Sequence, residues 1–168
     1  MNRTLITTTA AALLLGTLTA CSTTAQDSND KGGAVDTKSL DAAGAFSRLS
    51  GKISTATLSG TVTAENDPNK LLGRPNQYTS KITFTDSQIS ADDVTGTDRG
   101  DVSRGGAIEV FGSPADAVAR AKYIQAVTKG MPALSEYDYV HGTVVVRVSH
   151  YLTPKQAAVY ESATNGLS

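Results

Sequence analysis

The stretch that decides the fold is AIEVFGSPADAVARAKYIQAVTKG, residues 107–130. Its first five residues are mostly apolar and predict a strand. Ser113 then precedes a proline and, two residues later, an acidic side chain, which is how many helices begin, because serine caps the first free N–H groups and proline fits the first turn. Apolar residues recur along one face of the following segment. The stretch therefore predicts a strand followed directly by a helix.

A second apolar run, VVVRV at residues 144–148, is typical of a central strand that is covered on both faces. Together with 107–130 it predicts a β-α-β unit over roughly residues 107–149, with a right-handed crossover if both strands share a sheet. Residues 80–86 alternate polar and apolar side chains and predict a half-buried strand, which we expect to pair antiparallel beside this unit.

The remaining segments add helices and loops. Residues 40–53 carry an apolar stripe at helical spacing, with Ser39 as the expected N-cap, and TPKQ at 153–156 has the capping-box pattern of a final helix. Asn66 or Asp67 caps a single turn that starts at Pro68. Residues 56–63 fit either a short strand or an extended loop, and residues 87–106 have the composition of a long loop. We expect an α+β fold: a small mixed sheet of three or four strands, packed by helices on one face.

The N-terminal segment has the layout of a secretory signal peptide. Arg3 precedes an apolar run at 10–15, which is too short to span a membrane, and small residues follow at 19 and 20. Residues 22–38 have almost nothing to bury and predict a disordered tether. The expected organisation is a signal peptide over 1–20, an anchored cysteine and tether over 21–38, and a single α+β domain over 39–168.

The four residues Leu18-Thr19-Ala20-Cys21 resemble the lipobox of bacterial lipoproteins. The resemblance implies cleavage between Ala20 and Cys21 and acyl chains, palmitate among them, on the Cys21 sulfur. Cys21 is the sole cysteine and cannot form an internal disulfide. Each buried methylene adds about 0.8 kcal/mol of membrane affinity, so a diacylglyceryl group would hold the chain on the membrane. The open alternative is an ordinary signal peptide that leaves a free thiol.

Composition and motifs limit the chemistry. The net charge of −1 lacks the basic footprint of a nucleic-acid-binding protein. Neither a G-x-S-x-G elbow nor a phosphate-binding glycine loop occurs, and the acidic residues of 92–101 do not have EF-hand spacing. We therefore expect no catalytic residue, no metal and no cofactor. The two histidines, His141 and His150, read as surface residues at strand ends, and the alternative is that one of them serves as a base.

A candidate binding surface combines two aromatic residues with nearby charges. Tyrosine offers amphipathic contact area, so Tyr137 and Tyr139 resemble a recognition loop, joined by His141 and by Arg99 and Arg104 of the long loop. The alternative for the two tyrosines is that their rings cover the sheet edge, which we favour.

Four stretches together resemble short actinobacterial lipoproteins of uncharacterised function: ENDPNKLLGRPNQY, GGAIEVFGSPADAVARAKYIQA, YDYVHGTVVVRVS and LTPKQAAVYE, within residues 65–161. The resemblance implies a shared α+β domain on the extracytoplasmic face of the cell membrane, and no particular activity. We expect a lipid-anchored, non-catalytic binding or interaction module with a protein or small-molecule partner. The alternatives are a cell-surface hydrolase that uses His141 or His150, and an inhibitor-like or peptide-binding module that uses a sheet edge.

Overall fold

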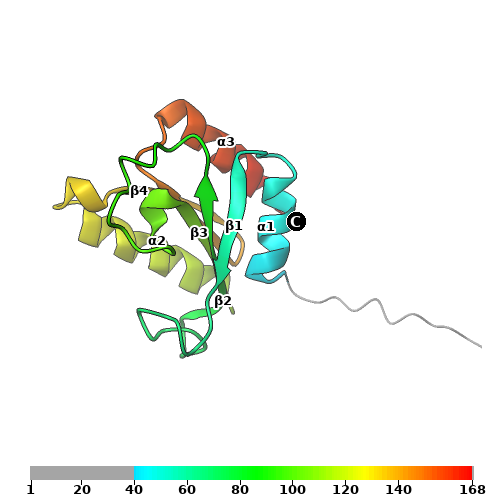
Figure 1. Ribbon diagram of the computed structural model, residues 1–168. Coiled ribbons are helices and arrows are strands. Elements are labelled where there is room, and N and C mark those ends of the chain that lie inside the picture. The colour runs from blue at the N-terminus through cyan, green and yellow to red at the C-terminus, as the bar shows by residue number, and fades with distance from the viewer. Residues whose placement is uncertain (1–39, 168) are drawn as a thin grey trace, which may run out of the picture. The chain divides into compact units, whose positions relative to one another are not determined.

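The computed structural model describes residues 40–167 (Figure 1). The expected signal peptide, lipidated Cys21 and tether lie outside the described residues. No helix within 40–167 combines the length and the apolar character needed to cross a bilayer. The elements in chain order are α1 (Ala42–Ser50), β1 (Ala56–Thr61), β2 (Tyr78–Asp86), the 3-10 helix η1 (Val102–Arg104), β3 (Gly105–Phe111), α2 (Pro114–Thr128), the 3-10 helix η2 (Pro132–Leu134), β4 (Glu136–His141), β5 (Val144–Ser149) and α3 (Pro154–Asn165).

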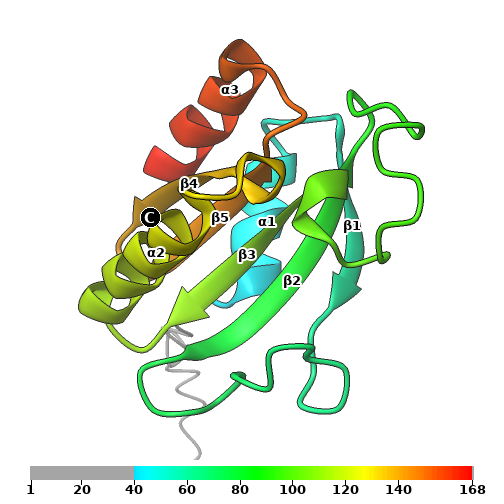
Figure 2. The same ribbon diagram turned by 90° about the vertical axis from the view of Figure 1, so that its left-hand side faces the viewer.

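The strands form one open sheet in the order β1-β2-β3-β5-β4, and every neighbouring pair is antiparallel. Helices α1 and α3 pack on one face of this sheet and α2 packs on the other (Figure 2). The α+β class is confirmed. The sheet has five strands rather than three or four, it has no parallel neighbours, and helices cover both faces rather than one.

The β-α-β unit is present, but its second strand is β4 and not the Val-rich β5. β3 and β4 run parallel because each pairs antiparallel with β5, which lies between them. The difference lies in the segment around Tyr137 and Tyr139, which resembles a recognition loop in the sequence. This segment forms an edge strand, and the turn itself is the two-residue link Gly142-Thr143, where glycine takes the positive φ of 54° that a tight hairpin favours.

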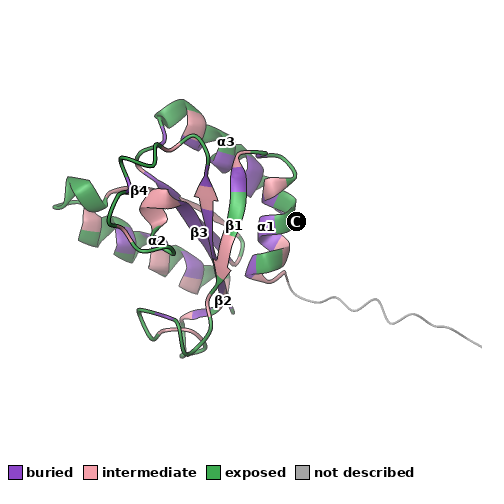
Figure 3. Cartoon of the chain, viewed as in Figure 1, coloured by how far each residue is buried: buried purple, intermediate pink, exposed green. Residues whose placement is uncertain are grey.

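The larger core lies between the sheet and helices α1 and α3. The Phe84 ring stacks on Tyr160 of α3 with centroids 5.6 Å apart, and it also contacts Phe46 of α1 at 5.7 Å. Buried residues line the sheet and the helix surfaces that face it, as the colouring in Figure 3 shows. The Tyr160 hydroxyl donates to the Asp86 carboxylate, and so one polar bond also holds α3 to β2.

Side-chain caps fix where each helix begins. Ser113 and Thr153 are the N-caps of α2 and α3, as predicted, and the capping box with Gln156 is complete. The N-cap of α1 is Asp41, whose carboxylate accepts a hydrogen bond from the Gly44 N–H at 2.7 Å. The expected cap, Ser39, lies outside the described residues.

Helix α2 covers only part of its face of the sheet. The smaller core beneath it contains Tyr78, Phe111 and Val145 from the strands and Ala117 and Ala121 from the helix. The rest of this face carries polar and charged side chains, and that is where the candidate site lies.

Candidate functional site

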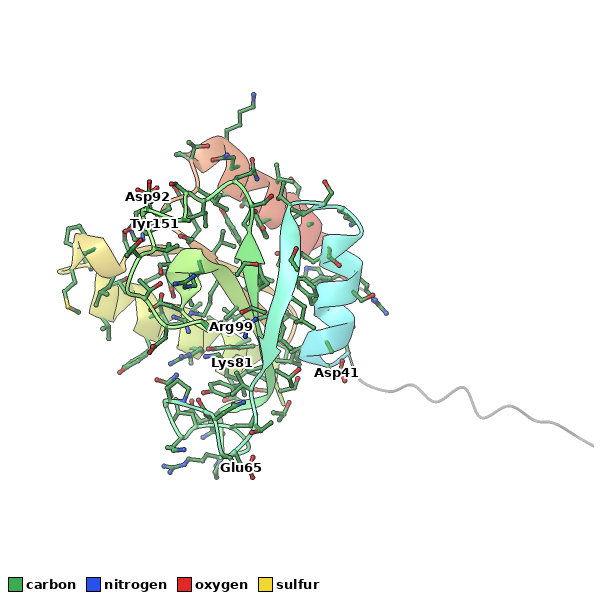
Figure 4. The ribbon with its side chains drawn as sticks, in the orientation of Figure 1. Asp41, Glu65, Lys81, Asp92, Arg99 and Tyr151 are labelled. Atoms are coloured by element: carbon green, nitrogen blue, oxygen red, sulfur yellow. The ribbon has the colours of Figure 1, made fainter. Side chains whose placement is uncertain are left out.

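A row of alternating charges crosses the α2 face of the sheet. Lys81 of β2 lies opposite Glu109 of β3, and their side chains form an ion pair of 2.9 Å. Arg147 of β5 binds Glu109 at 3.1 Å and Glu136 of β4 at 2.8 Å. Four neighbouring strands therefore each contribute one charge, in the order plus, minus, plus, minus. Lys81 is labelled in Figure 4.

Glu109 is the centre of this row and is fully buried. Besides Lys81 and Arg147, it accepts two hydrogen bonds from Arg120 of α2, at 2.8 and 3.2 Å. Burial alone would raise the pKa of Glu109, but the surrounding positive charges outweigh it and hold the pKa at about 2. Glu109 is therefore ionised at neutral pH, and its bond to Arg120 ties α2 to the sheet.

Asp138 differs from its acidic neighbours in its hydrogen bonding and in its pKa. It lies opposite Arg147 in the register, yet both of its carboxylate oxygens are buried without a hydrogen-bond partner among residues 40–167. Burial, and then the nearby charge of Glu136, raise the pKa of Asp138 to about 8. The raised pKa favours the protonated form of Asp138, and the ion pairs of the cluster join three cations, Lys81, Arg120 and Arg147, to two carboxylates, Glu109 and Glu136.

Two adjoining cavities open beside this cluster, and we call them together the groove. The first, of about 540 Å³, lies over β1 and β2 and is bounded by the loops at 62–68 and 98–101. The second, of about 320 Å³, lies between the loop at 100–103, η2 and the ends of β4 and β5. Pro68, Lys81, Gly100 and Asp101 line both cavities. Lys81 therefore sits where the two halves of the groove meet.

Asp67 holds one wall of the groove in place. Its buried carboxylate accepts hydrogen bonds from the backbone N–H groups of Asn69, Leu71 and Leu72 and from the Tyr78 hydroxyl, all between 2.8 and 3.1 Å. Burial would raise the pKa of Asp67, but these donors lower it to about 2. The turn predicted at Pro68 is thus organised by a single ionised side chain.

Arg104 holds the opposite wall. Its guanidinium donates to the Thr97 hydroxyl at 2.9 Å and to the carbonyl oxygens of Val94 and Thr97 at 3.1 and 2.9 Å. The Ser59 hydroxyl of β1 donates to the Arg99 carbonyl oxygen at 2.9 Å. The long loop predicted from composition is therefore a built structure, and it includes η1. The predicted binding residue Arg104 is engaged within that loop.

The structure does not bring the five predicted surface residues together. Arg99 lines the first cavity of the groove (Figure 4). Tyr137 and Tyr139 stack on each other, with centroids 6.5 Å apart, and pack on the larger core at the opposite face of the sheet. The Tyr137 hydroxyl donates to the Leu152 carbonyl oxygen at 3.3 Å. The tyrosines thus have the packing role that the sequence favoured, and His141 lies at the end of β4.

The two histidines lie at opposite ends of the β4–β5 hairpin. His141 ends β4, whereas His150 follows β5 and lines the second cavity beside Ser103 and Ser149. The Ser149 hydroxyl donates to the Ser103 carbonyl oxygen at 2.7 Å. Among residues 40–167, no hydrogen bond joins His150 to a serine or a carboxylate, and no group of three or more His, Cys, Asp or Glu side chains could hold a metal ion.

The charged cluster lies outside the predicted site residues, although the sequence carries a signal for it. Glu109 interrupts the apolar run AIEVF, and Arg147 interrupts VVVRV. Ionised side chains are rarely buried unless they are paired, so a charge inside a buried strand demands a partner of opposite sign. Only the strand register identifies which residues those partners are.

Comparison of the sequence with protein-family models and with curated proteins, and of the fold with solved structures, returns no match. The function must therefore be argued from the geometry of the groove and from the N-terminal motif.

Proposed function

We propose that this chain is a lipid-anchored extracytoplasmic binding module, without catalysis, whose ligand site is the groove on the α2 face. The observation that carries the binding role is the pair of adjoining cavities that meet at Lys81. Ligand sites for small molecules commonly have volumes of about 300–1,000 Å³, and both cavities fall in this range.

The groove has walls that are fixed before any ligand arrives. Asp67 and Arg104 hold the two loops through hydrogen bonds within each loop, and the ion pairs of Glu109 hold the floor. A preformed site loses little conformational entropy on binding, which favours affinity. The floor charges are engaged with one another, an arrangement that suits holding a ligand better than transferring protons.

The N-terminal segment supports the proposed location outside the cytoplasm. The Leu18-Thr19-Ala20-Cys21 motif directly after a short apolar run supports export, cleavage and acylation of Cys21. A domain held by acyl chains through a polar tether meets its ligand close to the membrane surface.

The peptide-binding alternative needs a free strand edge flanked by tyrosines. Tyr137 and Tyr139 instead are half-buried and pack on the larger core, which gives their rings a structural role. The hydrolase alternative rests on His150, which lines the groove but lacks a hydrogen-bonded serine or carboxylate among residues 40–167. Of these functions, the geometry favours ligand binding in the groove.

A blocking substitution tests the binding role. Gly100 lines both cavities, and a Cβ built there lies 3.7 Å from the Thr83 side chain, an ordinary contact distance, so Gly100→Trp should fold and fill the groove. Gly112→Trp is the matched control because a Cβ at Gly112 meets no atom within 4 Å and Gly112 lies outside the groove lining. The full chain is incubated with a small-molecule extract of the cell envelope, and bound compounds are identified by mass spectrometry.

We expect the parent and Gly112→Trp to retain the same compounds and Gly100→Trp to lose them by at least tenfold. Equal retention by the parent and Gly100→Trp, or no retained compound in any of the three proteins, would contradict binding in the groove.

A further inference from the structure

We propose that the Lys81 ammonium binds the acid group of a small monocarboxylate where the two cavities meet, an assignment that rests on the groove being the ligand site. The ligand class follows from three features of the groove: the free hydrogen-bonding capacity of Lys81, the charge balance of its floor, and the polar groups of its walls.

Lys81 is placed to contact a ligand in either cavity. Its side chain is 6 % exposed, and it lines both halves of the groove. An ammonium has three donors. Among residues 40–167 the structure gives Lys81 Nζ one hydrogen bond, to Glu109 Oε1 at 2.9 Å, and a position 5.0 Å from the centre of the Tyr78 ring. Two donors therefore remain for a group in the groove.

The charge balance leaves Lys81 in surplus. Arg120 and Arg147 already neutralise Glu109, and Arg147 also binds both oxygens of Glu136 at 2.8 and 3.0 Å. Asp138 presents no hydrogen bond to any cation of the cluster within 40–167. Lys81 shares the single charge of Glu109 with two arginines, so its own charge is only partly compensated, and an anion interacts more strongly with a charge buried to this degree than with one at the surface.

The walls limit how much negative charge the ligand carries. Asp98 and Asp101 line the first cavity together with Arg99, so this wall carries two acids and one base, which disfavours a polyanion such as a phosphate ester. Ser59, Thr61 and Thr83 line the same cavity. Ser103 lines the second cavity, and its hydroxyl oxygen is buried without a partner among residues 40–167. A ligand that has one acid group, and hydroxyl or amine groups on the rest of the molecule, matches this lining.

Ligand-observed NMR on the full chain in detergent micelles tests the assignment. The probes are sodium gluconate and sodium lactate as monocarboxylates, lactamide as the neutral counterpart, and inorganic phosphate as the multivalent anion. Lys81→Met removes the ammonium and leaves an unbranched apolar side chain that is one atom shorter. Lys122→Met, at an exposed lysine of α2, is the matched control.

For the parent protein we expect saturation transfer to gluconate or lactate but not to lactamide, and weaker binding of phosphate than of the monocarboxylate. Lys81→Met should bind the monocarboxylate at least tenfold more weakly, whereas Lys122→Met should bind it as the parent does. The comparison of lactate with lactamide uses the parent protein alone, so it tests whether the groove recognises an acid group even if Lys81→Met does not fold.

Two failures are distinguishable. Probes that bind the parent and Lys81→Met equally but are lost from Gly100→Trp, or lactamide that binds as well as lactate, would overturn the role of Lys81 and leave the groove as the ligand site. If the parent protein binds neither monocarboxylate, the proposed role of Lys81 is overturned as well. Binding that neither Lys81→Met nor Gly100→Trp changes would overturn both assignments.

Discussion

At the scale of single residues, the molecule is organised by one buried acid. Glu109 accepts hydrogen bonds from one lysine and two arginines on three different elements, β2, α2 and β5. Such a cluster stabilises the fold only while it is complete, because removing one partner leaves the others buried without compensation. Lys81, Glu109 and Arg147 are each visible in the sequence as charges beside apolar residues, but their pairing depends on strand register, which a single sequence does not provide.

Replacing Glu109 by a neutral residue tests how much the charged cluster contributes to stability. We expect Glu109→Gln to lower the free energy of unfolding by about 3–5 kcal/mol, since Lys81 and Arg120 would then lose their ionised partner and Arg147 would keep only Glu136. Urea denaturation followed by circular dichroism measures the change. Glu161→Gln, at an exposed glutamate of α3, is the control and should shift stability by less than about 0.5 kcal/mol. Equal effects of the two substitutions would show that the cluster contributes little.

Asp138 gives the protein a pH dependence of definite sign. Its pKa is about 8 in the folded protein against an ordinary 3.8, so between these values the folded state holds a proton that the unfolded state has released. Stability from this group is therefore full below about pH 4 and is lost as the pH rises toward 8. Asp138→Asn removes this loss, and its stability relative to the parent should increase steadily from pH 4 to pH 8. Urea denaturation at several pH values measures the difference, and a constant difference would contradict the assignment.

At the scale of elements, short sequence patterns predicted most of the helix caps, helices and strands. The caps at Ser113 and Thr153, the strand at 80–86 and the helix of 114–128 all follow from short patterns, and the structure contains them. β4 was missed because its alternation of tyrosines with charged and polar residues resembles a loop. β3 begins at Gly105, two residues earlier than expected, because glycine is a weak strand former whose role here is set by neighbours distant in sequence.

Gly106 of β3 shows how neighbours that are distant in the sequence require a glycine. A Cβ at this position would overlap the Arg147 carbonyl oxygen and the Phe84 ring, so the strands reach their packing only without a side chain there. We expect Gly106→Ala to cost about 1–3 kcal/mol of stability, as overpacking of a core commonly does. Gly112→Ala, where a Cβ meets nothing within 4 Å, is the control and should be close to neutral. Thermal denaturation of both variants provides the comparison, and an unchanged melting temperature for Gly106→Ala would be inconsistent with the packing described.

At the scale of the whole molecule, the sequence predicted the α+β class but not the order of the strands. Class follows from the kinds of elements, which local patterns reveal. The order β1-β2-β3-β5-β4 depends on long-range pairing, and so do the two faces of the sheet and the groove between its loops. For the same reason the predicted surface residues do not lie together. Arg99 lines the groove, whereas the two tyrosines lie on the opposite face of the sheet.

We propose that acyl chains on Cys21 hold the ligand-binding domain outside the cytoplasm. Mass spectrometry of the N-terminal peptide tests it most directly, using the full chain produced in a bacterium that processes lipoproteins, with Cys21→Ser as the control. We expect a mature N-terminus at Cys21 whose mass includes a diacylglyceryl group, and recovery of the protein in the membrane fraction, which Cys21→Ser abolishes. A mature chain that begins at another residue, or a Cys21 sulfur without fatty acid, would contradict the claim.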